Sequence, residues 1–450
     1  MKLIKLFSAV IFFFFIQGCA SLFVTGSPEF IKVNGIHLEL SGKPYYFAGA
    51  NMWYGCYISA EGKTGDRERL IRELDRLQSI GITNLRILGA SEKSYFKTEV
   101  EPAIQIKPGV YNEDILKGLD FLLMEMHKRN MHAVIYLNNF WNWSGGMAEY
   151  NTWSENGKGV QESGDDYDPV MDYTATFYGN QKAQELYIHY VYSIVTRKNT
   201  YTGINYNEDP TIMAWQLANE PRPGRNTFWL DEYYRWIETT AQFIHNIDHN
   251  HLVSTGSEGT IGSLQDSTIF FNAHKTKYID YLTFHLWPKN WGWYNAKESQ
   301  QTYPSALKKA VNYINDQIEL ARQLNKPIVM EEFGLPRDSE LCQPGSPTNM
   351  RDKYFNKILT LVYDSSFSGA PIAGTDFWAW SGEGRSRNSD NVWRPGDPFL
   401  GDPPQEPQGL NSIFDVDTST IKILRDNAFK MNSLDHKFLD KDSHELKSNK

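Results

Sequence analysis

Short apolar runs alternate with amphipathic segments along most of the chain. Eight apolar runs are typical of buried strands: residues 45–51, 84–88, 133–138, 212–217, 252–255, 281–285, 328–331 and 374–378. Between them, apolar residues recur at helical spacing over residues 66–80, 112–130, 178–197, 230–247, 305–324 and 351–364. Strands that alternate with helices predict an α/β protein with a parallel sheet, and eight such units predict a single (β/α)8 barrel, the TIM-barrel fold.

Three long segments rich in polar, glycine and aromatic residues follow predicted strands. Residues 141–173, 288–303 and 382–409 are therefore expected to be loops, and long loops after strands build the functional face of such a barrel. Asn34-Gly35, between alternating apolar positions of residues 30–40, predicts a hairpin ahead of the barrel. We expect one barrel domain over residues 30–433 and a polar, solvated tail over residues 434–450.

The first residues have the pattern of an export signal. Lys2 and Lys5 precede an apolar stretch at residues 6–16, which is too short to span a bilayer permanently. Ile-Gln-Gly-Cys at residues 16–19 resembles a bacterial lipobox, in which Cys19 becomes the lipidated first residue of the mature chain. We expect a lipoprotein-type signal peptide at 1–18, a tether at 19–29 and a lipid anchor on the cell envelope. The alternative is simple secretion without use of Cys19.

Composition narrows the possible functions. Lys and Arg number 45 against 54 acidic residues, and the net charge of −9 argues against a nucleic-acid partner. Aromatic residues make up 14% of the chain, with 13 tryptophans, and flat apolar rings suit flat apolar ligands. The sequence contains no phosphate-binding loop, His-Glu-x-x-His or Cys-x-x-Cys motif, and implies no metal or cofactor. Cys56 and Cys342 could pair in an exported compartment or remain two free thiols.

Two acidic motifs close predicted strands. The fourth strand ends in Asn-Glu-Pro, with Glu220 in the middle, and the seventh ends in Glu-Glu-Phe-Gly at residues 331–334. A barrel places these ends at one rim, so both carboxylates would face one cleft. Glycosidic bond cleavage needs two carboxyl groups, one to protonate the leaving oxygen and one to attack or to activate water. Either glutamate alone would be an ordinary acid, but the pair predicts a glycosidase.

The residues around both motifs resemble glycoside hydrolase family 5. Asp-Pro-Thr-Ile-Met-Ala-Trp-Gln-Leu-Ala-Asn-Glu-Pro-Arg at 209–222 is similar to the endo-β-1,4-mannanase branch, and so are Asn-Asn-Phe-Trp at 138–141, Thr-Phe-His-Leu-Trp-Pro at 283–288 and Phe-Trp-Ala-Trp at 377–380. The resemblance extends from about residue 30 to residue 429. It implies a retaining, endo-acting hydrolase of β-1,4-mannosidic linkages, with mannan, glucomannan or galactomannan as the partner. We expect a monomer.

Two alternatives remain open. An endo-β-1,4-glucanase of the same family would act on a substrate that differs in the orientation of one hydroxyl. A non-catalytic surface glycan-binding lipoprotein would keep the groove but not cut. Such degenerate barrels lose a catalytic carboxylate, whereas Glu220 and Glu332 are both present.

Carried over residue by residue, the resemblance implies Glu220 as the acid/base and Glu332 as the nucleophile. The family's nucleophile directly precedes the aromatic-glycine pair, which favours Glu332 over Glu331. Strand alternation agrees, because adjacent residues point to opposite faces and one of the two can reach the cleft. Retention requires the two carboxyl groups to lie about 5–5.5 Å apart.

The resemblance also implies supporting residues at the strand ends. Arg86 would lie close to Glu332, lower its pKa and keep it ionised. Asn219 would hold the substrate 2-hydroxyl or the nucleophile, and His285 would orient a carboxylate or a hydroxyl. Trp287 stands where many members have a tyrosine that hydrogen-bonds the nucleophile; an indole can donate one hydrogen bond but cannot accept one or ionise.

Several tryptophans fall at or just after predicted strand ends. Trp380 matches the family's sugar platform beneath the scissile residue, and Trp141 is a candidate for a neighbouring subsite. Trp53 and Trp287 are further candidates for substrate binding, although any single tryptophan can equally belong to the core. Several platforms in one groove favour a polymer that is attacked internally.

Overall fold

The computed structural model describes residues 29–96, 98–154 and 167–434. The predicted signal peptide, Cys19 and most of the predicted tether and tail lie outside these ranges. Leu434, where the polar tail was expected to begin, is fully buried against Tyr46 and Met431, so the folded domain includes it. No helix in the described ranges combines the length and apolar character needed to cross a bilayer.

Eight parallel strands form the barrel, which confirms the predicted (β/α)8 fold. They are β4 (Phe47–Asn51), β5 (Asn84–Leu88), β8 (His132–Tyr136), β9 (Ile212–Gln216), β10 (Leu252–Ser254), β11 (Leu282–Leu286), β12 (Ile328–Phe333) and β13 (Ile372–Phe377). Their order in the sheet is β10-β9-β8-β5-β4-β13-β12-β11. Hydrogen bonds from Asp280 N to Val253 O (2.8 Å) and from His285 N to Glu258 O (3.2 Å) connect the first and last strands.

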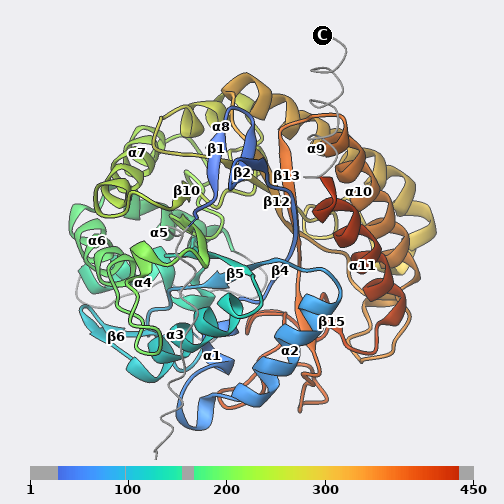
Figure 1. Cartoon of the computed structure of the whole chain (residues 1–450), viewed down its shortest axis with the longest axis horizontal. Helices are drawn as coiled ribbons and strands as arrows, with labels where there is room; N and C mark the ends of the chain where they lie inside the picture. Colours follow the sequence, from blue (N-terminus) through green and yellow to red (C-terminus); the bar gives the residue numbers. More distant parts are fainter. Residues whose placement is uncertain (1–28, 97, 155–166, 435–450) are drawn as a thin grey trace, which may run out of the picture.

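Helices surround the strands (Figure 1). The main ones are α2 (Arg67–Ser79), α3 (Glu113–His127), α6 (Gln181–Val195), α7 (Leu230–Ile247), α8 (Ser267–His274), α9 (Ser299–Leu324), α10 (Asn349–Phe367) and α11 (Thr418–Asn432). In α2, Leu70, Leu74 and Leu77 are buried at helical spacing, and the Asp66 side chain caps the helix by accepting from Arg69 N. All six predicted helices are present. The pattern did not predict α8 and α11.

An antiparallel sheet closes the amino-terminal end of the barrel. It consists of β1 (Lys32–Asn34), β2 (His37–Leu40) and β3 (Lys43–Pro44). Ile31 and Leu38 pack with apolar side chains from the starts of barrel strands. The predicted hairpin is confirmed, but its turn is Gly35-Ile36, because Asn34 already pairs with His37 and Gly35 has a φ of +61°.

The barrel interior is apolar near the amino-terminal ends of the strands and polar near their carboxyl ends. Phe47, Val134, Leu252 and Val329 belong to the apolar layer next to the hairpin. Toward the carboxyl ends of the strands follow side chains that can hydrogen-bond or ionise and are at most 1% exposed: Asn51, Arg86, Gln216, Glu331 and Asp376. Buried polar groups need partners, and this layer forms the floor of the functional site.

The expectation that residues 141–173 form a loop is wrong in part, because this segment contains α4 (Gly146–Ser154) and most of α5 (Asp168–Ala175). In α4 nearly every residue is buried, so the helix lacks the amphipathic pattern that would predict it. The segment at 288–303 is shorter as a loop than expected, since α9 begins at Ser299. Besides short 3-10 helices, the remaining elements are α1 (Gly55–Ile58), β6 (Gln105–Lys107), β7 (Val110–Tyr111), β14 (Trp380–Gly382) and β15 (Ile413–Phe414).

Cys56 and Cys342 are both free, so the alternative in which they pair is wrong. The Cys56 thiol is fully buried and lies 3.4 Å from the Leu88 carbonyl oxygen. Burial raises the pKa of this thiol well above its ordinary value. Cys56 is therefore a packing residue without thiolate reactivity.

Candidate functional site

A cleft of about 690 Å³ opens at the carboxyl end of the barrel strands. The loops after β8, β9, β10, β11 and β13 line it, together with the end of β12. Five of the predicted site residues line the cleft: Trp141, Asn219, Glu220, Trp287 and Glu332. Arg86 and His285 are fully buried next to them. The strand-end motifs therefore converge on one site.

The two predicted carboxylates face each other across His285. Its Nδ1 atom lies 2.6 Å from Glu220 Oε1 and 3.3 Å from Glu332 Oε2. These three side chains offer atoms that all lie within 4.8 Å of one another. Glu220 has a φ of +50°, an uncommon conformation for a residue with a side chain, and its N–H donates to Gly256 O at 2.9 Å. Glu332 lines the cleft and Glu331 does not, as expected, but both carboxylates contact Arg86, so simple strand alternation is not the reason.

Arg86 is anchored by hydrogen bonds to four side chains. Nη1 donates to Glu332 Oε1 and, at 3.3 Å, to Asn51; Nη2 donates to Asn219 Oδ1 at 2.8 Å, and Nε to Gln216 Oε1 at 2.9 Å. The predicted proximity of Arg86 and Glu332 is confirmed. Asn219 contacts Arg86 and, through Nδ2, Asn139 Oδ1 at 3.2 Å.

The pKa of Glu332 responds to opposing influences. Burial raises it, and the nearby Glu220 carboxylate raises it further, whereas Arg86 and the Trp287 N–H lower it. The net direction is upward because burial outweighs Arg86, whereas the expectation that Arg86 lowers this pKa is confirmed. Because Arg86 binds Glu332 and not Glu220, it favours a distribution in which Glu332 carries the charge and Glu220 the proton.

Burial and nearby positive charges favour the neutral form of His285. Burial lowers its pKa well below the ordinary value, and the positive charges of Arg86 and Arg222 lower it further, although Glu258 opposes this. A neutral imidazole can hydrogen-bond a carboxyl group without adding a charge between two acids. Nε2 of His285 has no hydrogen-bond partner among the described residues.

Two indole N–H groups bind the carboxyl pair. Trp141 Nε1 donates to Glu220 Oε2 at 2.6 Å, and Trp287 Nε1 donates to Glu332 Oε2 at 3.1 Å. Trp287 therefore supplies a donor to Glu332 at the position where the family pattern has tyrosine. The expectation that Trp141 lies in the cleft is confirmed.

Arg222 and Glu258 belong to the cleft but were not among the residues predicted from the sequence. Arg222 Nη2 lies 2.6 Å from Glu258 Oε1, and its guanidinium stacks over the Trp141 ring at 4.8 Å. Burial raises the pKa of Glu258 to about 7, although Arg222 opposes the shift. Both have strand-end positions that could have identified them: Arg222 follows the Asn-Glu-Pro motif, and Glu258 follows the fifth barrel strand.

The prediction that Trp380 and Trp53 bind sugar in the cleft is wrong. Trp380 is 1% exposed and does not line the cleft, because its Nε1 donates to Glu73 Oε2 of α2 at 3.0 Å. Trp53 is equally buried and donates to Gly401 O at 2.9 Å. Trp378, two residues before Trp380, lines the cleft instead, with its ring centroid 6.0 Å from that of Trp287.

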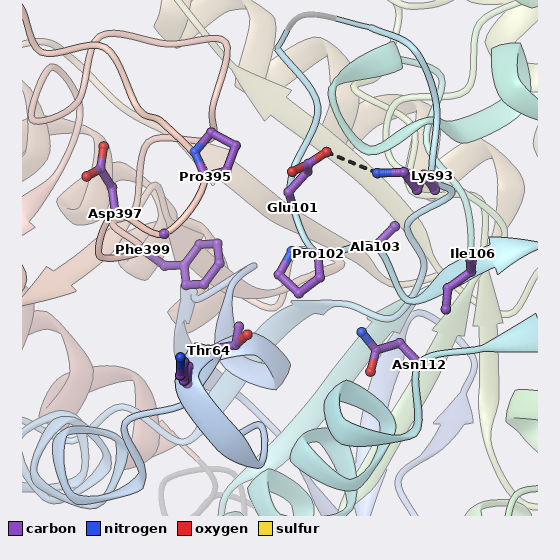
Figure 2. Close-up of a pocket in the computed structure, with 12 residues that line it drawn as sticks. Thr64, Lys93, Glu101, Pro102, Ala103, Ile106, Asn112, Pro395, Asp397 and Phe399 are labelled. Atoms are coloured by element: carbon purple, nitrogen blue, oxygen red, sulfur yellow. Dashed lines mark hydrogen bonds and ion pairs between the residues drawn. The ribbon is translucent and has the colours of Figure 1, made fainter.

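A second hollow, of about 430 Å³, shares the loop after β13 with the cleft (Figure 2). It is lined by residues that follow β4, β5 and β13, and a 3.1 Å ion pair between Lys93 and Glu101 lies in its wall (Figure 2). None of the predicted site residues lines this hollow. Phe399, which lines it, contacts Trp53, and Trp53 contacts Trp143 of the cleft.

One set of acidic and histidine side chains among the described residues is close enough to share a metal ion, and it is the carboxyl pair with His285. Arg86 already supplies a positive charge to this set, and a cation would be repelled by it. The sequence-based prediction that no metal or cofactor is needed stays a prediction.

Comparison with known proteins gives concordant matches. Residues 28–436 match the family described as GH family 5 beta-mannosidase-like. The mannan endo-1,4-beta-mannosidase 5 of Solanum lycopersicum is 31% identical over 372 residues, which cover 80% of this chain and 83% of that protein.

Two solved structures extend the comparison. The glycoside hydrolase family 5 mannosidase from Rhizomucor miehei has a TM-score of 0.83 at 34% identity and covers 92% of this chain and 100% of its own. A variant of that protein has been solved in complex with mannosyl-fructose. The endo-beta-1,4-mannanase from Thermotoga petrophila has a TM-score of 0.65 at 25% identity, over 87% of this chain and 78% of its own.

Proposed function

The chain belongs to glycoside hydrolase family 5, and on this premise we propose that it hydrolyses internal β-1,4-mannosidic bonds of mannan-type polysaccharides with retention of configuration. The carrying observation is the close approach of the two carboxyl groups, whose nearest atoms lie within 4.8 Å of each other and of His285. Retaining glycosidases have carboxyl groups about 5–5.5 Å apart, whereas inverting ones leave about 6.5–9.5 Å for a water molecule. The short distance supports the retaining mechanism.

In the proposed mechanism Glu332 attacks the anomeric carbon while Glu220 protonates the leaving oxygen. The bond from the anomeric carbon to the leaving oxygen breaks as the bond to Glu332 forms. Glu220, now ionised, then removes a proton from water, which attacks the same carbon and releases Glu332. Arg86 and Trp287 support the charge on Glu332, and Trp141 and His285 orient Glu220.

The cleft offers aromatic surfaces for the apolar faces of sugar rings. Trp141, Trp287 and Trp378 line it, and together they suit a chain of pyranose units rather than a charged ligand. Asn219, at the edge of the carboxyl pair, is proposed to bind the hydroxyl next to the anomeric carbon. The Solanum lycopersicum and Thermotoga petrophila proteins are named for mannan, which favours mannan over the glucan alternative.

A second candidate is release of single mannose units from chain ends. It is favoured by one observation: the Rhizomucor miehei protein, named a mannosidase, matches with a TM-score of 0.83, against 0.65 for the Thermotoga petrophila endo-mannanase. The two candidates share the carboxyl pair and differ in how many sugar units bind on either side of it. Product length therefore separates them.

We also propose that the mature protein is a monomer held on the cell envelope by a lipid on Cys19. The support is the charged, apolar and Gly-Cys pattern of residues 2–19. Metabolic labelling with a lipid precursor, compared between the wild type and Cys19→Ala, tests the anchor. Loss of label and release of the variant from membranes are expected, and equal membrane retention would contradict it.

The main experiment analyses products from linear mannan and from carboxymethyl cellulose, with the wild type and Glu220→Ala. Oligosaccharides from mannan, a rapid fall in viscosity and loss of activity in the variant are expected. Mannose alone, with little change in viscosity, would identify the end-acting candidate. Cleavage of the cellulose derivative alone would move the protein to the glucanase alternative, and binding without cleavage would support the glycan-binding lipoprotein.

A further inference from the structure

Beneath the nucleophile position, a second glutamate is bound to Arg86 through an amide. Gln216 Nε2 lies 2.5 Å from Glu331 Oε1 and 2.6 Å from Oε2, while Gln216 Oε1 accepts from Arg86 Nε at 2.9 Å. Glu331 Oε2 lies 3.6 Å from Arg86 Nε. The amide of Gln216 is therefore fixed in one orientation, with its nitrogen donating to Glu331 and to Ser254 Oγ and its oxygen accepting from Arg86.

The side chains around Glu331 influence whether its carboxyl group is ionised. Arg86 faces it from β5, Gln216 from β9, the Tyr281 hydroxyl at 3.4 Å from the residue before β11, and Asp376 from β13, while Glu332 is its chain neighbour. Burial raises the pKa of Glu331 above its ordinary value, and Arg86, Gln216 and Tyr281 offset part of this rise in favour of the charged form. An ionised carboxylate accepts hydrogen bonds through both oxygens, as Glu331 does from Gln216.

Asp376 differs from Glu331 although both are buried acids of the same layer. Neither carboxyl oxygen of Asp376 has a hydrogen-bond partner among the described residues. Burial raises the pKa of Asp376 well above its ordinary value, and the charge of Glu331 raises it further. Burial therefore favours the neutral form of Asp376, whereas Glu331 is the acid whose charged form is stabilised by hydrogen bonds and by Arg86.

The charge on Arg86 needs a second partner during the reaction. While Glu332 is ionised, Arg86 has two negative neighbours, Glu332 and Glu331. When Glu332 forms its ester with the sugar, that carboxylate loses its charge, and a buried guanidinium with no other counter-ion would be costly. With Glu331 in place, Arg86 keeps one negative neighbour in both states.

We propose that Glu331, acting through Gln216, is a positioning residue for the reaction: it holds Arg86 against Glu332 and balances the Arg86 charge in the glycosyl-enzyme. This inference rests on the proposed retaining mechanism with Glu332 as the nucleophile. Glu331 is fully buried and does not line the cleft. Its effect on the reaction passes through Arg86.

Three variants test the proposal with linear mannan as substrate. Glu331→Gln removes the charge but keeps the shape. The double variant Gln216→Glu with Glu331→Gln exchanges acid and amide across the same hydrogen bond, which places the carboxylate next to Arg86 Nε. Asp376→Asn is the matched control, because it also converts a buried acid of this layer into an amide. Thermal unfolding and circular dichroism establish that each variant is folded.

In Glu331→Gln, we expect kcat/KM to fall roughly 10- to 100-fold, mostly through kcat, because Arg86 binds the ionised nucleophile more strongly and the ester less well. The acidic limb of the pH profile should move down by about one pH unit. Without the negative charge of Glu331, the positive charge of Arg86 acts more strongly on Glu332 and lowers its pKa. In the double variant we expect about tenfold recovery of kcat/KM and return of the acidic limb. Asp376→Asn should leave the limb in place.

The outcomes separate the two proposals. If the wild type does not cleave mannan, the proposed function fails. If the wild type is active and folded Glu331→Gln keeps both its kcat/KM and its pH profile, the positioning role fails alone. The same follows if the double variant is folded but no more active than Glu331→Gln, or if Asp376→Asn moves the limb equally. If Glu331→Gln does not fold, the double variant decides. A folded double variant with kcat/KM within about threefold of the wild type would support the positioning role, and one with kcat/KM lowered roughly 10- to 100-fold would contradict it.

Discussion

Replacement of Arg86 by methionine is expected to move the pH dependence of the reaction to higher pH. Arg86 lowers the pKa of Glu332 against the raising effects of burial and Glu220. Two unit charges about 4 Å apart at an effective dielectric constant of about 20 attract by about 4 kcal/mol, an upper limit of roughly three pKa units. Neighbouring side chains and dipoles rearrange after Arg86 is replaced, which reduces this effect. We therefore expect the pKa of Glu332 to rise by about one to two units.

The methionine variant should also lose stability. Arg86 is fully buried, and its removal takes away the donors to Glu332 Oε1, Asn219 Oδ1 and Gln216 Oε1. Breaking a buried ion pair by removal of one partner costs about 3–5 kcal/mol. Arg86→Lys keeps the charge but cannot form all four hydrogen bonds, so its acidic limb should move less than that of Arg86→Met while its kcat still falls.

The assay is the pH dependence of kcat/KM on mannan between about pH 4 and pH 9 for the wild type and both variants, with folding checked by thermal unfolding. An ionised nucleophile is required, so activity should be lost on the acidic side at a higher pH in Arg86→Met than in the wild type. An acidic limb that stays in place in a folded Arg86→Met variant would refute the assigned electrostatic role of Arg86.

Three further predictions follow from named contacts. Trp287→Phe removes the 3.1 Å hydrogen bond to Glu332 and should lower kcat by about 10- to 100-fold, with partial recovery in Trp287→Tyr; steady-state kinetics on mannan measure this, and equal rates for all three proteins would contradict it. Trp378→Ala should raise KM and lower kcat with little loss of stability. Trp380→Ala should instead destabilise the fold by about 3–5 kcal/mol and leave the kinetics of the folded fraction closer to wild type. The reverse pattern would return Trp380 to the substrate site. Burial raises the pKa of Glu92 from its ordinary 4.5 to about 8, so the folded state binds this proton more tightly than the unfolded state, and the associated stability is lost as the pH rises from about 4.5 through about 8. In urea unfolding, Glu92→Gln should therefore be more stable than the wild type by about 5 kcal/mol at pH 9 and of similar stability near pH 4, and a difference independent of pH would argue against a raised pKa.

The barrel and the carboxyl pair could be predicted because they depend on local pattern. Strands buried on both faces form continuous apolar runs, and parallel connections bring all their carboxyl ends to one rim. For this reason Glu220 and Glu332, which are 112 positions apart, could be placed in one cleft before any contact was known. The helix α4 escaped prediction because nearly all its residues are buried and no polar stripe marks its surface.

The errors within the site come from partners that lie far away in the sequence. Trp378 and Trp380 have similar surroundings in the chain, and it is Glu73 of α2, 307 positions from Trp380, that fixes the second indole in the interior. The net pKa shift of Glu332 depends on the extent of burial, which the presence of Arg86 does not reveal. The role inferred for Glu331 likewise depends on the orientation of the Gln216 amide, a property of the folded barrel alone.

The central claim is retention through a covalent intermediate on Glu332, and the most direct measurement follows the anomeric configuration of the newly formed reducing end. Proton NMR during rapid cleavage of a manno-oligosaccharide, before mutarotation, should show the β-anomer first. Peptide mass analysis after reaction with a 2-deoxy-2-fluoromannosyl fluoride should place the sugar on Glu332. Initial appearance of the α-anomer, or a sugar bound to a different residue, would contradict the assignment.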